Sequence, residues 1–181
     1  MAPFFLMLKP HSNIFLVGLM AVGKSTVGKY LAKELKLEFY DSDRTIEQFA
    51  GADISWIFDV DGETGFRDRE AQVIDELTQK RGIVLATGGG VILREENRRH
   101  LAARGIVVYL VSPLNRLVER THGDKRRPLL RDSNAIDVFQ KLQNERGPLY
   151  REISDHEFSA DQRSPRTLAR SIAAALVKQE A

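Results

Sequence analysis

The segment from Gly18 to Thr26 constrains the fold of this chain more than any other part of it. It reads Gly-Leu-Met-Ala-Val-Gly-Lys-Ser-Thr and matches the pattern G-x-x-x-x-G-K-[ST] in full. An apolar strand candidate, Ile14 to Val17, precedes it, and an amphipathic stretch from Ser25 to Leu35 follows it. The alternative is a Gly-containing turn that matches the pattern by chance, and the strand and helix on either side argue against it. The sequence therefore predicts a loop whose backbone N–H groups bind phosphate.

The side chains of this loop indicate a nucleoside triphosphate and its metal ion. We expect Lys24 to reach the β- and γ-phosphates and the Ser25 hydroxyl to ligate Mg²⁺. The predicted cofactors are thus ATP and Mg²⁺, and the residues expected to hold ATP here are Ala21, Val22, Gly23, Lys24, Ser25 and Thr26. The motif alone does not separate an enzyme from a module that binds a nucleotide without chemistry.

Short apolar runs alternate with longer helical patterns along the rest of the chain. Further strand candidates are Leu37–Tyr40, Ile83–Ala86, Ile106–Val111 and His156–Ser159, and further helices are expected from about Phe66 to Lys80 and from Ser164 to Lys178. Ser164 is a suitable cap for the last helix, with Pro165 at its first position. The alternation predicts an α/β fold with a parallel five-stranded sheet and helices on both faces. Ligands of such folds bind at the carboxyl ends of the strands.

Composition narrows the class of protein further. The 181 residues fit one domain, and 27 basic against 25 acidic residues give a net charge of only +2. This balance predicts no nucleic-acid and no membrane partner. The absence of cysteine excludes disulfides and thiolate metal sites, and the apolar run Phe4–Leu8 lacks the flanks of a signal peptide. We therefore expect a cytoplasmic protein, and a monomer because no heptad or long apolar patch is present.

Of the second, third and fourth strand candidates, only the second is followed by carboxylates. Thr87–Gly90 and Ser112–Pro113, which follow the third and fourth strands, offer none. By elimination, Asp41 is the predicted carboxylate for the metal, acting through water. Asp43 could accept a proton from a substrate hydroxyl or orient it. The alternative is that Asp41 or Asp43 caps a helix that starts near Arg44, but for Asp43 the position at a strand end favours function.

Several motifs stand in the order found in the shikimate kinases. Besides the phosphate loop they are Asp41-Ser42-Asp43, Gly62-Glu63 with Phe66-Arg67, Gly88-Gly89-Gly90, Arg127-Pro128-Leu129-Leu130 and Arg146 with Pro148-Leu149-Tyr150. The chain resembles this family from about Asn13 to Lys178. The resemblance implies one domain over residues 1–181 with the nucleoside-monophosphate-kinase-like P-loop fold. Its parts would be the phosphate loop at 18–26, a substrate-binding segment at about 41–70 and a mobile lid at about 121–133.

The resemblance also implies a reaction and the residues that serve it. The γ-phosphate of ATP would pass to the 3-hydroxyl of shikimate, giving shikimate 3-phosphate and ADP on the route to chorismate and the aromatic amino acids. By position, the residues that resemble shikimate contacts are Asp43, Arg67, the glycines Gly88, Gly89 and Gly90, and Arg146; those that resemble ATP and Mg²⁺ contacts are Lys24, Ser25 and Thr26. Arg127 resembles the lid arginine that approaches the transferring phosphate, and Arg163 lies where the family lines the adenine pocket.

The chemistry of shikimate agrees with these residue types. Its carboxylate suits the planar guanidinium groups of Arg67 and Arg146, and its reacting hydroxyl suits Asp43. The glycines would allow close approach to backbone N–H groups, although they could also form a plain turn. Without the resemblance, Arg67 is not distinguishable from Arg69, since both belong to a charged helix face where arginines are commonly solvated.

Ala21 and Trp56 carry two local expectations, and two alternative functions remain open. The family often has glycine where this chain has Ala21, and alanine is tolerated there if φ is negative. Trp56 is expected in a local core beneath the substrate segment, with Ile54, Ile57 and Phe58. Among alternatives, a gluconate or nucleoside-monophosphate kinase shares the phosphate loop but lacks the Asp-x-Asp, triple-glycine and Arg-Pro-Leu-Leu set. A non-catalytic nucleotide-binding module would be free to lose Lys24 or Ser25, and both are retained.

Overall fold

The fold is built on a five-stranded parallel sheet, as the sequence predicts. The computed structural model describes residues 12–122, 134–161 and 163–178. The strands are β1 (Ile14–Val17), β2 (Glu38–Asp41), β3 (Ile83–Ala86), β4 (Ile106–Val111) and β5 (His156–Ser159). They lie in the order β2-β3-β1-β4-β5, and every neighbouring pair is parallel. The central strand β1 leads directly into the phosphate loop.

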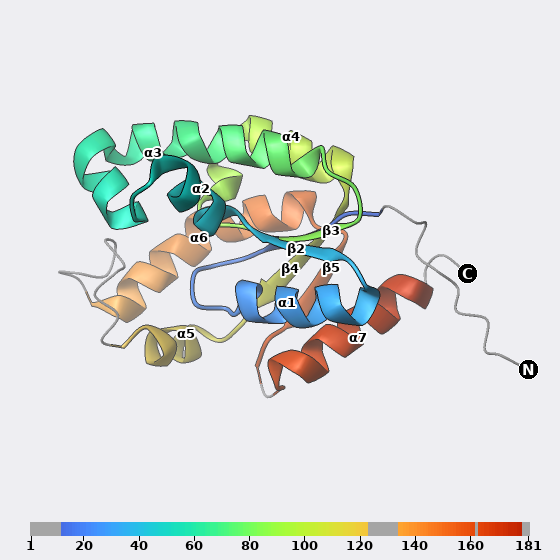
Figure 1. Cartoon of the computed structure of the whole chain (residues 1–181). Helices are drawn as coiled ribbons and strands as arrows, with labels where there is room; N and C mark the ends of the chain where they lie inside the picture. Colours follow the sequence, from blue (N-terminus) through green and yellow to red (C-terminus); the bar gives the residue numbers. More distant parts are fainter. Residues whose placement is uncertain (1–11, 123–133, 162, 179–181) are drawn as a thin grey trace, which may run out of the picture.

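Helices cover both faces of this sheet. They are α1 (Lys24–Leu35), α2 (Ser42–Ala50), α3 (Ile54–Thr78), α4 (Glu95–Arg104), α5 (Leu114–Thr121), α6 (Ala135–Ile153) and α7 (Pro165–Lys178), with a short 3₁₀ helix, η1, at Val91–Leu93. Figure 1 shows α1 and α7 side by side on one face, while α3 and α4 lie on the other. None of the described helices combines the length and the apolar character needed to cross a bilayer.

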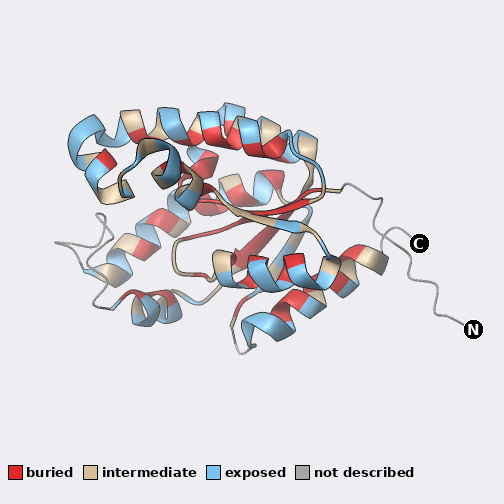
Figure 2. Cartoon of the chain, in the orientation of Figure 1, coloured by how far each residue is buried: buried red, intermediate tan, exposed pale blue. Residues whose placement is uncertain are grey.

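The inner strands are apolar because both faces of the sheet are covered. Every residue of β1 and β3 is buried, whereas the edge strand β2 is partly exposed (Figure 2). The strand β2 begins one residue later than predicted. Lys36 ends α1 in the left-handed conformation, and the Leu37 N–H still donates to Ala32 O at 2.9 Å, so Leu37 belongs to the helix end.

The helix expected from about Phe66 begins earlier and contains a kink. Helical residues start at Ile54, where the Asp53 side chain accepts a hydrogen bond from Trp56 N at 2.8 Å. Gly62, at φ 69° and ψ −178°, interrupts the helix and thereby the periodicity. The expectation that Trp56 is core is wrong, since it is 52% exposed. The predicted Ser164 cap on α7 is confirmed, because its hydroxyl accepts from Thr167 N at 3.1 Å.

Candidate active site

The phosphate loop carries its lysine folded back onto its own backbone. Lys24 is buried, and its ammonium group donates to the carbonyls of Gly18 and Leu19 at 2.7 and 2.8 Å. Gly18 and Gly23 have positive φ values of 145° and 103°, which glycine adopts without strain. The loop thus holds a positive charge at its centre, next to the N-terminus of α1.

Ala21 departs from its expected conformation. Its φ is 65°, so the negative φ under which alanine was expected to be tolerated is not found. A left-handed alanine costs on the order of 1 kcal/mol. The guanidinium of Arg120, on α5, donates to the carbonyls of Ala21 and Val22 at 3.2 Å each and so holds the loop in this shape. Sequence reasoning missed Arg120, because nothing local links it to a loop about 100 residues earlier.

Asp41 joins the phosphate loop to the segment that follows β2. Its Oδ2 accepts from the Ser25 hydroxyl at 2.5 Å, while its Oδ1 accepts from the N–H groups of Asp43 and Arg44 at 3.1 and 3.2 Å. Asp41 is therefore the N-cap of α2, which begins at Ser42 rather than near Arg44. The capping interpretation is correct for Asp41, and the same carboxylate also faces the loop.

The Ser25 hydroxyl and the Asp41 carboxylate suit a magnesium ion. Both are oxygen ligands, and they already lie in contact. Within the described ranges, no group of three or more His, Asp or Glu side chains could hold a metal. Mg²⁺ typically takes one or two protein ligands and fills the rest of its shell with water and phosphate oxygens. The Ser25 hydroxyl and the Asp41 carboxylate match this number of protein ligands.

Asp43 is a buried carboxyl group in the first turn of α2. Burial, together with the neighbouring charges of Asp41 and Glu70, raises its pKa to about 7, although Lys24 opposes the shift. Its Oδ1 has no hydrogen-bond partner among the described residues. A buried oxygen without a partner is costly and calls for an explanation such as a ligand. Asp43 is thus poised to accept a hydrogen bond or a proton near neutral pH.

Arg67 and Glu70 form a buried ion pair on α3. Nη1 of Arg67 lies 2.6 Å from Oε2 of Glu70, which is fully buried. Burial raises the pKa of Glu70, and the Arg67 guanidinium opposes this shift. Arg69 instead pairs with Asp61 at 2.7 Å and is 44% exposed. The structure therefore separates the two arginines that the sequence could not. Glu70 was missed, although its spacing of three residues from Arg67 was a readable signal.

Side chains of the site pack closely against the triple glycine after β3. A Cβ on Gly88 would lie 2.7 Å from Oδ1 of Asp43 and 3.0 Å from Oε1 of Glu70. On Gly90 it would lie 2.2 Å from Nη2 of Arg67. The Gly88 N–H donates to the Ser42 hydroxyl at 3.0 Å. The segment is therefore more than a plain turn, because its bare backbone forms one wall of a polar site.

The helix α6 contributes the second arginine of this site. Arg146 is 8% exposed, and its Nε has no hydrogen-bond partner among the described residues. The same holds for Nε of Arg67 and for Oε1 of Glu70. Asp43, Glu70 and Arg67 thus lie against the glycines, and the charge of Arg146 acts on Glu70; each of the four has an atom without a partner among the described residues. Such a site suits a small anion that brings both a carboxylate and hydroxyl groups.

A cavity of about 340 Å³ lies beside the phosphate loop. Its walls come from the loop, α5, the end of β5 and α7, and its lining residues are Ala21, Val22, Gly23, Thr26, Val27, Arg120, Ala160, Arg163, Pro165 and Leu168. Arg163, predicted to lie near the adenine, is among them. Arg127 and the predicted lid residues 123–133 lie outside the described residues.

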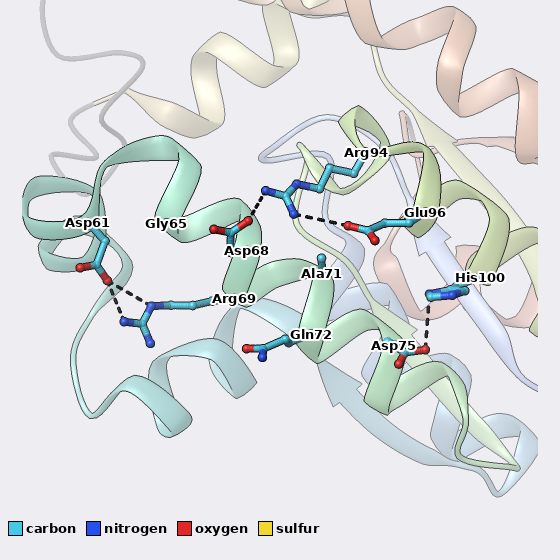
Figure 3. A pocket seen from close by; sticks show the side chains of 10 residues that line it. All are labelled: Asp61, Gly65, Asp68, Arg69, Ala71, Gln72, Asp75, Arg94, Glu96 and His100. Atoms are coloured by element: carbon cyan, nitrogen blue, oxygen red, sulfur yellow. Dashed lines mark hydrogen bonds and ion pairs between the residues drawn. The ribbon is translucent and has the colours of Figure 1, made fainter.

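A larger cavity, of about 720 Å³, lies between α3 and α4 (Figure 3). Each basic side chain that lines it is paired with a carboxylate: Arg69 with Asp61, Arg94 with Asp68 and Glu96, and His100 with Asp75. No residue of the phosphate loop or of the glycine segment lines it. Because both arginines that line this cavity are paired with carboxylates, it offers no unpaired arginine to a phosphate.

Comparison with known proteins agrees with this geometry. A family model described as shikimate kinase matches residues 20–177. A shikimate kinase of Legionella pneumophila (strain Corby) is 56% identical over 160 residues, which are 88% of this chain and 91% of that protein. The solved structure of a shikimate kinase from Acinetobacter baumannii in complex with shikimate has a TM-score of 0.92 at 46% identity, covering 94% of this chain and 95% of that one. A gluconokinase from Sinorhizobium meliloti has a TM-score of 0.60 at 18% identity, over 95% of each chain, which shows a shared fold alone.

Proposed function

The chain belongs to the shikimate kinase family, and from this premise we propose which of its residues bind the two substrates and transfer the phosphoryl group. It is an ATP-dependent kinase that phosphorylates shikimate, a step of aromatic amino-acid biosynthesis. The predicted enzyme class is confirmed, and the gluconate kinase alternative is not supported, since the likeness to a gluconokinase extends to the fold alone.

We assign the nucleotide to the phosphate loop and the cavity beside it. The loop N–H groups and Lys24 bind the phosphates, and Arg120 and Arg163 line the space for the base. Ser25 and Asp41 are the residues that would hold Mg²⁺, with Asp41 acting through water. The ion, when bound, neutralises charge on the β- and γ-phosphate oxygens.

We assign shikimate to the polar site around the glycines. Arg67 and Arg146 bind its carboxylate, because a guanidinium matches a carboxylate in shape and charge. Asp43 accepts the hydrogen of the reacting hydroxyl, and Gly88–Gly90 provide a wall without side chains. The Gly89 backbone packs against the phosphate loop, since a Cβ there would lie 3.2 Å from Met20 N. The acceptor site therefore adjoins the site of the phosphate that it receives.

The transfer itself then requires little from the protein beyond position and charge. Asp43, with a pKa of about 7, orients the hydroxyl and takes up its proton as the phosphoryl group moves. Lys24 stabilises negative charge that develops on the transferring group. Arg127, outside the described residues, is proposed from the family motif to join it there.

One observation carries this assignment: a buried Asp43 oxygen without a partner among the described residues and the guanidinium of Arg67 both lie against the glycine segment that packs on the phosphate loop. Composition supports a monomeric cytoplasmic enzyme as a further proposal. ADP release should be measured with ATP, Mg²⁺ and a panel of acceptors: shikimate, gluconate and nucleoside monophosphates. Turnover is expected with shikimate. Faster turnover with gluconate or a nucleotide, or ATP binding without turnover on any acceptor, would overturn the proposal.

A further inference from the structure

A buried tyrosine hydroxyl holds the backbone of the glycine segment. Tyr150, on α6, is completely buried, and its hydroxyl donates a hydrogen bond to the carbonyl of Gly89. Gly89 is the residue whose backbone packs against Met20 of the phosphate loop. The bond therefore reaches the point where the two proposed substrate sites meet.

The ring of Tyr150 has little freedom to move away from this position. It stacks on Tyr109 of β4, with ring centroids 5.0 Å apart and an interplanar angle of 28°. The Tyr109 hydroxyl in turn accepts a hydrogen bond from Gln143, also on α6, at 3.3 Å. Close packing inside a protein keeps such side chains in one rotamer. The Tyr150 hydroxyl is thus a fixed donor rather than an adaptable one.

A glycine peptide needs such a donor if it is to keep one orientation. The Gly89 carbonyl and the Gly90 N–H belong to the same planar peptide unit, so holding the oxygen also fixes the direction of that N–H. Glycine has no Cβ to restrict rotation of the plane. The N–H groups of Gly89 and Gly90 make no hydrogen bond within the described part of the chain.

The same contact links the glycines to the arginine on α6. Arg146 lies four residues before Tyr150, one helical turn away, and both side chains are buried. A bond from Tyr150 to Gly89 therefore sets the distance between the Arg146 turn of α6 and the glycine wall. These are the two sides between which the proposed shikimate site lies.

We propose that Tyr150 is a positioning residue for shikimate: its hydroxyl fixes the Gly89–Gly90 peptide and the register of Arg146 against it. The inference rests on the proposed function of the site. Tyr150 touches neither substrate in this account and acts through Gly89 and Arg146. Loss of the Tyr150 hydroxyl should therefore raise KM for shikimate and leave KM for ATP nearly unchanged.

The test compares Tyr150→Phe with Tyr109→Phe. Each variant removes one hydroxyl from the same stacked pair, but only the first frees the Gly89 carbonyl. Tyr150→Phe is expected to raise KM for shikimate about 10-fold, as the loss of a buried hydrogen bond commonly does. KM for ATP should stay within about twofold in both variants. Equal effects on the two substrates, or equal effects of the two variants, would overturn the inference.

Two further measurements separate the possible failures. If wild-type protein does not turn over shikimate, the proposed function fails; if it does and Tyr150→Phe matches it, only the positioning role fails. Should Tyr150→Phe not fold, the wild-type chain labelled with 3-fluorotyrosine serves instead, with resonances assigned by Tyr→Phe at positions 30, 40 and 109. Shikimate is expected to shift the ¹⁹F resonance of Tyr150 and ATP alone is not. An unmoved resonance would contradict the proposal.

Discussion

Oδ1 of Asp43 and Oε1 of Glu70 face the same point above Gly88. Each lies within 3.0 Å of the position that a Cβ on this glycine would take, and neither has a hydrogen-bond partner among the described residues. Burial raises the pKa of both groups, and the like charge of Glu70 raises the pKa of Asp43 further. This pair of carboxyl groups therefore retains a proton at a pH where isolated carboxyl groups are ionised.

Asp43→Asn should change how the stability of the protein depends on pH. The pKa of Asp43 rises from 3.8 to about 7 on folding. The stability that protonated Asp43 contributes is therefore fully present below about pH 4 and is lost as the pH rises through 7. Relative to the Asn variant, wild-type stability should fall by up to roughly 4 kcal/mol across this window. Urea unfolding of both proteins from pH 4.5 to 8.5 checks this. Parallel pH curves would contradict the raised pKa.

The same variant should lose turnover. Asn keeps the shape of Asp43 but cannot take up the proton, and general-base catalysis is typically worth about 100- to 10,000-fold in kcat. The affinity for ATP, measured by titration, should change little. In the wild type, kcat/KM for shikimate should rise with pH through about 7 as Asp43 ionises.

Lys24→Met should nearly abolish transfer in a folded protein. Removal of a charge aimed at the transferring phosphoryl group typically costs about 3 kcal/mol or more, which is over 100-fold in kcat. Lys29→Met is the matched control, because Lys29 lies on the exposed face of the same helix. Near-normal rates in a Lys24→Met variant with wild-type melting would show that the lysine has no role in the transfer.

Asp41→Asn should change the Mg²⁺ dependence without loosening α2. Asparagine caps a helix about as well as aspartate, so the melting temperature should hardly move. The Mg²⁺ concentration for half-maximal rate should rise several-fold, because a neutral amide attracts the ion less. Asp41→Ala should add a stability loss of about 1 kcal/mol. An unchanged Mg²⁺ titration for Asp41→Asn would remove Asp41 from the metal site.

Arg67→Ala should raise KM for shikimate by about 10- to 100-fold, since a charge-assisted hydrogen bond contributes about 1.5–3 kcal/mol. Arg69→Ala should not, because Arg69 pairs with Asp61 on the surface. Loss of Arg67 also leaves Glu70 buried without its cation, so melting must be recorded alongside the kinetics. A shikimate analogue without the carboxylate should lose less on mutation than shikimate does; equal losses would assign Arg67 another task.

Gly88→Ala should disable the shikimate site while leaving the nucleotide site intact. The new methyl group would lie 2.7 Å from Oδ1 of Asp43, so the carboxylates must move or the turn must shift. Overpacking of this kind costs about 1–3 kcal/mol. Calorimetric titration should show weakened shikimate binding with ATP binding retained. Wild-type affinity for shikimate would mean that the site tolerates the displacement.

The parts of the site that follow from local sequence could be predicted. The phosphate loop needs only its own residues, a strand before it and a helix after it, and the position of Asp41 follows from the end of β2. Asp41 contacts Ser25 and the start of α2, and both partners lie close to the end of β2.

The remaining parts depend on packing between distant segments. Arg120 and Tyr150 bind carbonyls 99 and 61 residues away, and no local pattern carries that information. The choice between Arg67 and Arg69 depends on which face of α3 meets the sheet. Trp56 was predicted to be core because its neighbours are apolar, but it is exposed while the adjacent Ile57 is buried, and the sequence pattern did not show which face of this helical turn is covered.

The unpartnered oxygens of Asp43 and Glu70 define what an inhibitor of this enzyme should carry. A ligand with an ammonium group in place of the hydroxyl that faces them would supply donors to both oxygens and a charge opposite to theirs. Its carboxylate would still meet Arg67 and Arg146 on the other side. Such a zwitterion would match the electrostatic pattern of the pocket more fully than the natural acceptor, and it would have no oxygen at the position that is phosphorylated.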